Sequence, residues 1–505
     1  MDSDDRRNIS KPSFRYALSM LLVVIAIISV GLVAFEAPIQ ILMFISILAI
    51  IPFMMGLGFT YKQVEKSMTR SMSRALQPGL ILLTVGILIG AWMASGTVPT
   101  LVYYGINAIS PQFFLLTALI FCSLVSLAIG SAWGTIGTAG IALMGVGATI
   151  GVPAGMTAGA IVSGAYFGDK MSPLSDTTNL TPTVTGGELF THIKHLLWTT
   201  VPAYIISAAI FTFLGLRYQA SSVNAESVNQ LTGYLAKHFN LGLVPLIPMI
   251  VLVTLLVLKK PALPAIFIGT AVGGLVAVFY QGFTFSGIIG LFYNGYTLES
   301  GIEMVDNLLM RGGLTSMLPL IVLFLFALGL GGMLSEAGVL ETLIASFAEK
   351  IQSTGMTVFA TILVSYSTLA IGGSIYFSTV MTGTLMRPIY DRLNLEPENL
   401  SRVIEDTATQ GGPLVPWTGA GIFAAGALGV PVSTYLPFCF LAFITPLVSL
   451  FYGVTGLTMT ESKGEKNQQR KKISTNNIGK NLTTKPGNKA VTDYVNAWSR
   501  KDLYS

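Results

Sequence analysis

The sequence has 505 residues, of which 52% are hydrophobic and only 10% are charged. A soluble protein carries about 25% charged residues, so this composition excludes an ordinary soluble domain. The net charge of +5 belongs to the C-terminal tail, because residues 458–505 hold ten Lys or Arg and four Asp or Glu, which is +6 and leaves −1 for the rest of the chain. No basic patch with interleaved aromatic residues indicates nucleic-acid binding.

Apolar runs recur along nearly the whole chain, many of them about 20 residues long, the length that crosses a bilayer as a helix. Because the N-terminus is charged and the first run is long, no cleavable signal peptide is expected. The sequence therefore predicts an all-α polytopic membrane protein. The runs lie at 17–35, 38–59, 78–95, 111–129, 132–150, 155–168, 193–216, 241–258, 262–280, 315–333, 356–371, 375–388, 400–425 and 435–457.

Two stretches of the chain resemble each other. LAIGSAW at 127–133 recurs as LAIGGSIY at 369–376, and an offset of 243 residues places Pro173 opposite Pro416. The preserved spacing indicates an internal duplication. Many transporters are built from such repeats, with the substrate site at the repeat interface, where helices are interrupted.

Each half is expected to contain two plain spans, a third, a re-entrant hairpin, a broken helix and a last span. Five crossings per half make the two structural repeats inverted, with about ten full crossings plus two hairpins. The expected parts are an N-terminal segment (1–16), a first repeat (17–217; hairpin 111–150, broken helix 155–190), an external linker (218–240), a second repeat (241–457; hairpin 356–388, broken helix 400–425) and a basic, disordered tail (458–505).

The distribution of charge indicates orientation. Lys and Arg gather in segments 1–16, 60–77 and 387–402 and in the tail, whereas the loop at 281–313 has three acids and one Arg. By the positive-inside rule, both termini are cytoplasmic in the inner (plasma) membrane.

The sequence GDKMSPLSDTTNL at 168–180 holds the charges that need an explanation. The 40 residues before it, 124–163, contain no Asp, Glu, Lys or Arg. Pro173 interrupts helical hydrogen bonding, and the freed carbonyls, carboxylates and hydroxyls form an oxygen-rich cluster that suits a hard cation. A carboxylate that loses its cation in a dry site takes up a proton, so one group can serve Na⁺ and H⁺ by turns.

This chemistry is that of a cation/proton antiporter. The alternative is a water-facing cytoplasmic loop, but acids within a membrane are functional by default. Lys170 is expected to reach the membrane interface, with pairing to Asp169 or Asp176 as the alternative. The expected cation- and proton-binding residues are Asp169, Ser172, Ser175, Asp176, Thr177, Thr178 and Asn179, with Asp169 and Asp176 as the Na⁺ ligands.

The second half lacks acids at the equivalent positions, which are Gly412 and Gly419. It is expected to contribute neutral groups and one acid: Asp406, Thr407, Thr409 and Gln410. Glu405 and Asp406 have an equal alternative as cytoplasmic-end acids paired with Arg402. The hairpin tips offer candidate neutral ligands at Ser131, Thr135, Ser374, Ser378 and Thr379.

Two aromatic residues and two histidines near these elements have less specific interpretations. Trp133 and Tyr376 occupy matching tip positions, where they either gate the site or pack. His192 and His195 are expected to be solvated at a helix start, with a pH sensor as the less favoured reading.

FGDKMSPLSDTTNL at 167–180, with GSAWGTIGT about 40 residues upstream, resembles the NhaC-type Na⁺/H⁺ antiporter family of the ion-transporter superfamily, over roughly residues 15–457. The resemblance implies a secondary transporter that exports Na⁺ in exchange for H⁺, with an elevator-like motion and no cofactor. A relative in the same family exchanges malate and protons for lactate and Na⁺. The expected partners are the lipid bilayer, Na⁺ and H⁺, with a homodimer as a candidate assembly.

Three rival functions remain at this point. An enzyme is disfavoured because no GxSxG or HExxH motif occurs. A channel is disfavoured by the duplicated hairpins and broken helices, which favour alternating access. The malate/lactate exchanger stays as the alternative, although an organic anion needs a fixed positive charge and only Lys170 is placed near the site.

Overall fold

The computed structural model describes residues 9–108, 110–218, 225–258, 260–298, 300–302, 305–306, 309–348 and 351–462. These residues are helical apart from their connections, and their one β-bridge joins Leu395 to Glu461. The N-terminal half contains α1 (Phe14–Ala34), α2 (Ile39–Gly56), α3 (Tyr61–Met72), η1 (Ser73–Ala75), α4 (Leu76–Ala94), α5 (Thr97–Ala108), η2 (Pro111–Phe113), α6 (Phe114–Ile129), α7 (Ala132–Thr135), η3 (Ile136–Gly140), α8 (Ile141–Thr149), α9 (Ala154–Met171), α10 (Asp176–Thr185), α11 (Leu189–Tyr218) and α12 (Ala225–His238).

The C-terminal half repeats much of this order after a helical pair. Its elements are η4 (Val244–Leu246), α13 (Ile247–Val257), α14 (Ala262–Phe279), α15 (Phe285–Asn294), η5 (Leu314–Met317), α17 (Leu318–Glu336), α18 (Val339–Ala348), α19 (Thr354–Gly372), α20 (Ile375–Arg392), α21 (Pro397–Ile404), η6 (Glu405–Thr409), η7 (Gly412–Leu414), α22 (Gly419–Leu428), α23 (Val432–Tyr435), η8 (Leu436–Phe438) and α24 (Phe440–Thr455).

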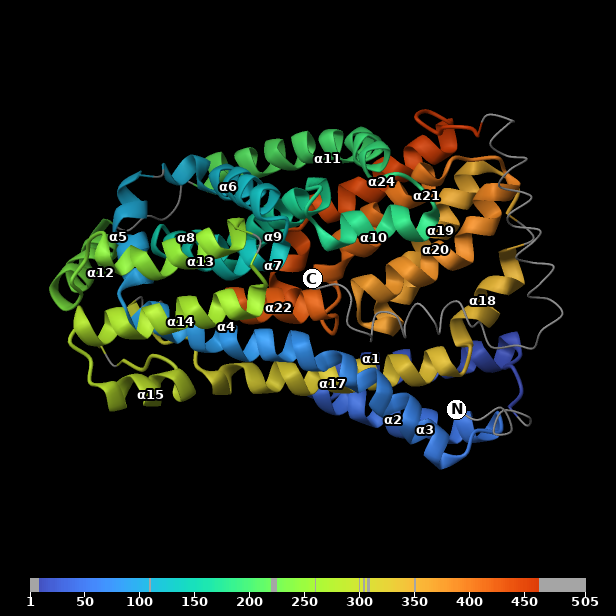
Figure 1. Cartoon of the computed structure of the whole chain (residues 1–505), viewed down its shortest axis with the longest axis horizontal. Coiled ribbons are helices and arrows are strands. Elements are labelled where there is room, and N and C mark those ends of the chain that lie inside the picture. The colour runs from blue at the N-terminus through green and yellow to red at the C-terminus, as the bar shows by residue number, and fades with distance from the viewer. Residues whose placement is uncertain are drawn as a thin grey trace.

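The helices pack in two groups (Figure 1). In one group, α1–α4 pack with α17, and α4 also packs with α14 and α15. In the other group, α6 packs on α9, while α10, α11 and α24 join α19 and α20. Most long helices lie along the long axis of the molecule (Figure 1), as expected of a bundle that crosses a membrane.

Eight helices in the described part of the chain are long and apolar enough to cross a membrane, or nine if the bent pair Gly419–Leu428 and Val432–Phe438 counts as one span. This confirms the prediction of a polytopic, all-helical membrane protein. Ten full crossings and an inverted second repeat stay predictions. The linker expected at 218–240 contains α12, and the tail beyond residue 462 lies outside the described residues.

The offset of 243 residues found in the sequence recurs in the backbone. The hairpin turns at Gly130 and at Gly373, both with positive φ, and the next residue caps the following helix in each case. The breaks also match, since α10 and α22 begin 243 residues apart and end at left-handed glycines, Gly186 and Gly429. Each half therefore builds the same hairpin and the same interrupted helix.

Within each half, the hairpin tip packs on the break of its own helix. The Ser172 hydroxyl donates to the Leu127 carbonyl (2.9 Å), and the Trp417 indole N–H donates to the Ala370 carbonyl (2.6 Å), with both pairs related by the same offset. The second limbs then cross over, because α10 packs on α20 of the other hairpin and α22 packs on η3. The two breaks are thereby brought together between the two hairpins.

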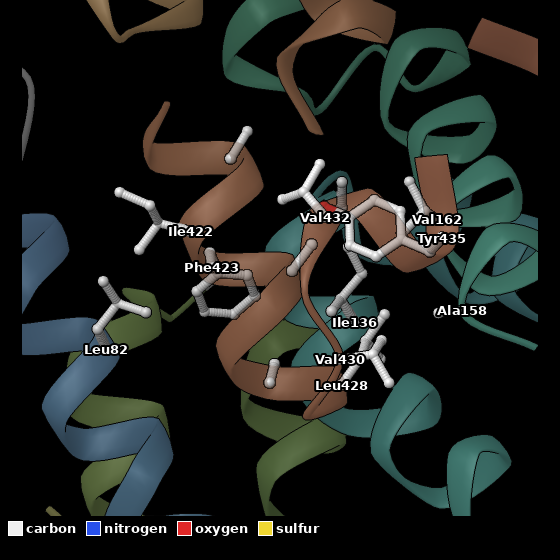
Figure 2. Packing of buried hydrophobic residues seen from close by; sticks show 14 of the residues in the cluster. Leu82, Ile136, Ala158, Val162, Ile422, Phe423, Leu428, Val430, Val432 and Tyr435 are labelled. Carbon is white, nitrogen blue, oxygen red and sulfur yellow. The ribbon is translucent and has the colours of Figure 1, made fainter. Parts of the chain in front are cut away.

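The region where α22 meets hairpin 1 is apolar (Figure 2). Phe423 stacks on Trp133 with ring centroids 4.4 Å apart, and Ile136 and Leu82 lie in the same buried cluster. Trp133 is thus packed between the halves in this structure, which fits the packing interpretation of this tip residue. Cys122 and Cys439 are buried and unbonded, as expected of small packing residues.

Candidate functional site

The break between α9 and α10 spans residues 172–175 and is held by its own polar groups. The Thr178 hydroxyl donates to the carbonyl of Lys170 (3.0 Å), and the Asn179 amide donates to the carbonyls of Pro173 (2.9 Å) and Ser175 (2.7 Å). These bonds satisfy carbonyls that the interruption at Pro173 frees from helical bonding. Ser172, Thr178 and Asn179 therefore shape the break, and their oxygen lone pairs remain as candidate ligands.

The two acids of this break face the two hairpin tips. Asp169 is half-buried at the end of α9, and its carboxylate interacts with the Ser175 side chain and the Ala132 backbone at the start of α7. Asp176 begins α10, is exposed, and its carboxylate interacts with Tyr376 at the tip of the other hairpin. The acids also interact electrostatically with each other.

The charges in this region have a favourable backbone setting. Helix N-termini carry unpaired N–H groups and a partial positive charge, which stabilise anionic groups. The N-terminus of α7 lies at Asp169, and Asp176 is itself in the first turn of α10. The arrangement can hold two carboxylates close together, which is the condition for binding a small cation or a proton in exchange.

Lys170 does not reach the interface and does not pair with Asp169 or Asp176. Its ammonium group is fully buried and forms an ion pair with the fully buried carboxylate of Asp406. The Thr199 hydroxyl on α11 donates to the same Asp406 oxygen (3.0 Å). The expectation that Lys170 snorkels is wrong, because the small residues of α9 bring this helix deep into the bundle, against η6.

Glu405 and Asp406 begin η6, a single π-helical turn. Such turns are rare and occur often at functional sites. Glu405 is fully buried and accepts a hydrogen bond from the Thr181 hydroxyl on α10 (2.6 Å). Neither acid pairs with Arg402, whose guanidinium donates to Thr458 (2.9 Å).

The remaining candidates of the second half lie in a buried hydroxyl network. The Thr407 hydroxyl donates to Ser365 (2.7 Å), the Ser378 hydroxyl donates to the Ser365 carbonyl (2.8 Å), and the Gln410 amide donates to the Tyr166 carbonyl of α9 (3.2 Å). Thr379 and Thr409 are buried with hydroxyls that have no hydrogen-bond partner. Gln410 is thus the member of this set that contacts the first broken helix directly.

The hairpin-tip residues are mostly engaged in capping. Ser131 accepts from the Gly134 N–H (3.1 Å) and Ser374 from the Phe377 N–H (3.5 Å), while the Thr135 hydroxyl donates to the Ser131 carbonyl (3.0 Å). These contacts explain why Ser occurs at both tips, since Ser is a preferred N-cap residue.

The two histidines are buried, and the expectation that they are solvated is wrong. His192 is 0% exposed and its Nδ1 lies 2.7 Å from the Ser401 hydroxyl, while His195 is 7% exposed. The start of α11 packs against α21, which covers both side chains.

The structure brings together the predicted residues of the first break, and it places Asp406 with Lys170 on the inner side of the same region. Within the described residues, no three His, Cys, Asp or Glu side chains are grouped as a metal site. A cation at Asp169 and Asp176 therefore needs further oxygens from hydroxyls and carbonyls, which suits Na⁺ better than a transition metal.

Sequence reasoning left Glu405 out of the candidate set. The signal that marks it is an acid inside an otherwise apolar segment, which is a functional hypothesis by default.

A bundle of membrane-spanning helices with duplicated hairpins, interrupted helices and buried acids at their meeting point defines an ion-coupled membrane transporter. Sequence comparison gives the family. The profile of the Na⁺/H⁺ antiporter family matches residues 164–457, and the chain belongs to this family.

Its relatives differ in what they exchange. The chain is 38% identical to a malate-2H⁺/Na⁺-lactate antiporter of Bacillus subtilis, with 89% of this chain and 96% of the relative covered. It is 37% identical to the Na⁺/H⁺ antiporter NhaC of Alkalihalophilus pseudofirmus, with 91% and 99% covered. It is 34% identical to an arginine/ornithine antiporter of Halobacterium salinarum, with 89% and 93% covered. Family membership therefore gives antiport and leaves the substrate to the site.

Proposed function

We propose that the protein exports Na⁺ in exchange for H⁺ by alternating access, with both termini in the cytoplasm and Asp169 and Asp176 as the groups that bind the two ions by turns. The observation that carries this proposal is the placement of the two carboxylates at the first break, each facing a different hairpin tip. Because a dry carboxylate without its cation is more stable as the neutral acid, Na⁺ and H⁺ compete for the site.

The charge at the break supports a cation over an organic anion. Lys170 is the one Lys or Arg between residues 154 and 185, and its ammonium is neutralised by Asp406. A carboxylate substrate needs a positive charge that is not already paired. The similarity to the malate-2H⁺/Na⁺-lactate antiporter keeps exchange of an organic acid as the second candidate.

Proteoliposomes test this proposal through Na⁺-driven changes of internal pH. We expect Asp169→Asn and Asp176→Asn each to reduce Na⁺-driven proton flux to the level of empty liposomes, because each removes a titrating ligand while keeping its shape. Asp391→Asn is the matched control, since Asp391 is half exposed on α20 and pairs with Arg387 at 3.9 Å.

Three outcomes separate the functions. Normal exchange in both Asp variants would remove these residues from the mechanism. Proton flux that requires malate outside and lactate inside would establish the second candidate. Na⁺ flux that cannot drive protons uphill would indicate a channel.

A further inference from the structure

Glu405 is a buried carboxyl group that the Asp169–Asp176 pair does not explain. Its side chain is 0% exposed, on the π-helical turn η6 of the second broken helix. Thr181 donates to Oε1 at 2.6 Å, and Oε2 has no hydrogen-bond partner. A buried ionised carboxylate with one donor is poorly stabilised, since its other lone pairs have lost water without replacement.

The charges around Glu405 do not balance if it is ionised. The charged groups that face it are Lys170 and Asp169 from α9 and Asp406 from its own turn, while α10 contributes the neutral Thr181. The ammonium of Lys170 forms its ion pair with Asp406. An ionised Glu405 would therefore be an uncompensated buried charge, which costs several kcal/mol. In this arrangement Glu405 is the neutral, protonated acid.

Glu405 is also linked to the proposed cation site. Its carboxyl interacts electrostatically with that of Asp169, which lies next to Lys170 in the chain. Thr181, its hydrogen-bond donor, belongs to α10, the helix that begins with Asp176. A Na⁺ ion held at the break adds a positive charge close to Glu405 and so stabilises its ionised form.

We propose that Glu405 is a second proton-carrying residue, which releases its proton when Na⁺ binds at the first break and takes it back when Na⁺ leaves. This inference rests on the proposed Na⁺/H⁺ exchange and adds a proton to it. Asp169 holds the proton that competes with Na⁺ directly, whereas Glu405 responds to the charge of Na⁺ without ligating it.

Proton release on Na⁺ addition tests this directly with the purified, full-length protein in detergent and a pH indicator in weak buffer. Proton release counts the groups whose protonation is linked to Na⁺ binding, so we expect about two protons per bound Na⁺ in the wild type and about one in Glu405→Gln. Bound ²²Na⁺ is measured on the same samples. Glu398→Gln is the matched control, because Glu398 is 9% exposed on the same helical segment and should leave the count unchanged.

The failures of the two proposals are distinguishable. A wild-type protein that binds Na⁺ and releases no proton overturns the proposed exchange and this inference with it. Proton release in the wild type, with an equal number in Glu405→Gln at equal Na⁺ binding, overturns the inference alone.

A gentler variant keeps the inference testable if Glu405→Gln fails to fold. Thr181→Val removes the donor to Glu405 and keeps the shape of the side chain. Since loss of a hydrogen bond to a carboxylate favours its protonated form, we expect the half-point of proton release to move up by about one pH unit. Thr185→Val is the control, because Thr185 is buried one turn later and donates to the Thr181 carbonyl (3.0 Å). No shift in Thr181→Val relative to this control would overturn the inference.

Discussion

The ion pair between Lys170 and Asp406 joins the two halves of the chain at a single point. Both side chains are 0% exposed, and Thr199 provides one further hydrogen bond to Asp406. Buried ion pairs gain little net stability, because removing two charges from water costs about as much as their attraction returns. The pair is therefore better understood as a device that fixes how the two broken helices meet.

This interpretation predicts a pattern of stabilities. Lys170→Met or Asp406→Leu alone leaves one buried charge without a partner, so each should lower the free energy of unfolding by about 3–5 kcal/mol. The double variant removes both charges and should recover most of that loss. Thermal unfolding in detergent measures all three proteins. A double variant as unstable as the single variants would show that the charges act on stability through other contacts.

At the residue scale, the sequence was enough to predict what lies close together in the chain. Asp169 and Asp176 flank Pro173, so a break at Pro173 with acids beside it follows from local chemistry. The partner of Lys170 lies 236 residues away. Spacing along the chain carries no information about such a pair, which depends on how closely α9 and η6 pack.

The two hairpins are the elements in which the duplication is most complete. Gly130 and Gly373 occupy equivalent turns with φ of +74° and +62°. A non-glycine residue pays about 1–2 kcal/mol for this left-handed conformation. The surroundings differ, however, because a Cβ at Gly130 would lie 2.6 Å from Leu174 Cβ, whereas the nearest atom at Gly373 is 3.4 Å away.

Alanine at the two turns should therefore have unequal effects. Gly130→Ala should be less stable than Gly373→Ala by about 1–3 kcal/mol, since its methyl group is forced against the break of the first broken helix. It should also lose more transport, because Leu174 belongs to the segment that carries Asp169 and Asp176. Unfolding in detergent and exchange in proteoliposomes provide the two measurements. Equal losses in both variants would contradict a specific contact between this tip and the break.

Element boundaries followed from the sequence where proline, glycine and the repeat offset marked them. The breaks at 172–175 and 415–418 are of this kind. The π-helical turns η3 and η6 and the helix α12 had no such signal. A π-turn depends on the packing of neighbouring helices around an inserted residue, which no local propensity describes.

At the scale of the whole molecule, the duplicated fold carries an unequal distribution of charge. Asp176 faces Tyr376, and the equivalent Gly419 lies beside Trp133, so the symmetric position has no carboxylate. The two halves thus form one cation site rather than two. With Glu405 as a second proton carrier, each cycle exchanges one Na⁺ for two protons and moves one net charge across the membrane.

Such an exchanger must respond to the membrane potential. One charge moved across 100 mV is worth about 2.3 kcal/mol, so the Na⁺ gradient sustained at equilibrium should change by about 50-fold at that potential. Proteoliposomes with a valinomycin–K⁺ potential allow this measurement, and because the equilibrium does not depend on how the protein is inserted, mixed orientations do not obscure it. In Glu405→Gln the exchange becomes one Na⁺ for one proton, and the gradient should no longer depend on potential, whereas Glu398→Gln should behave like the wild type. A wild-type gradient that is indifferent to potential would contradict the unequal exchange, because a net charge cannot cross the membrane without doing electrical work.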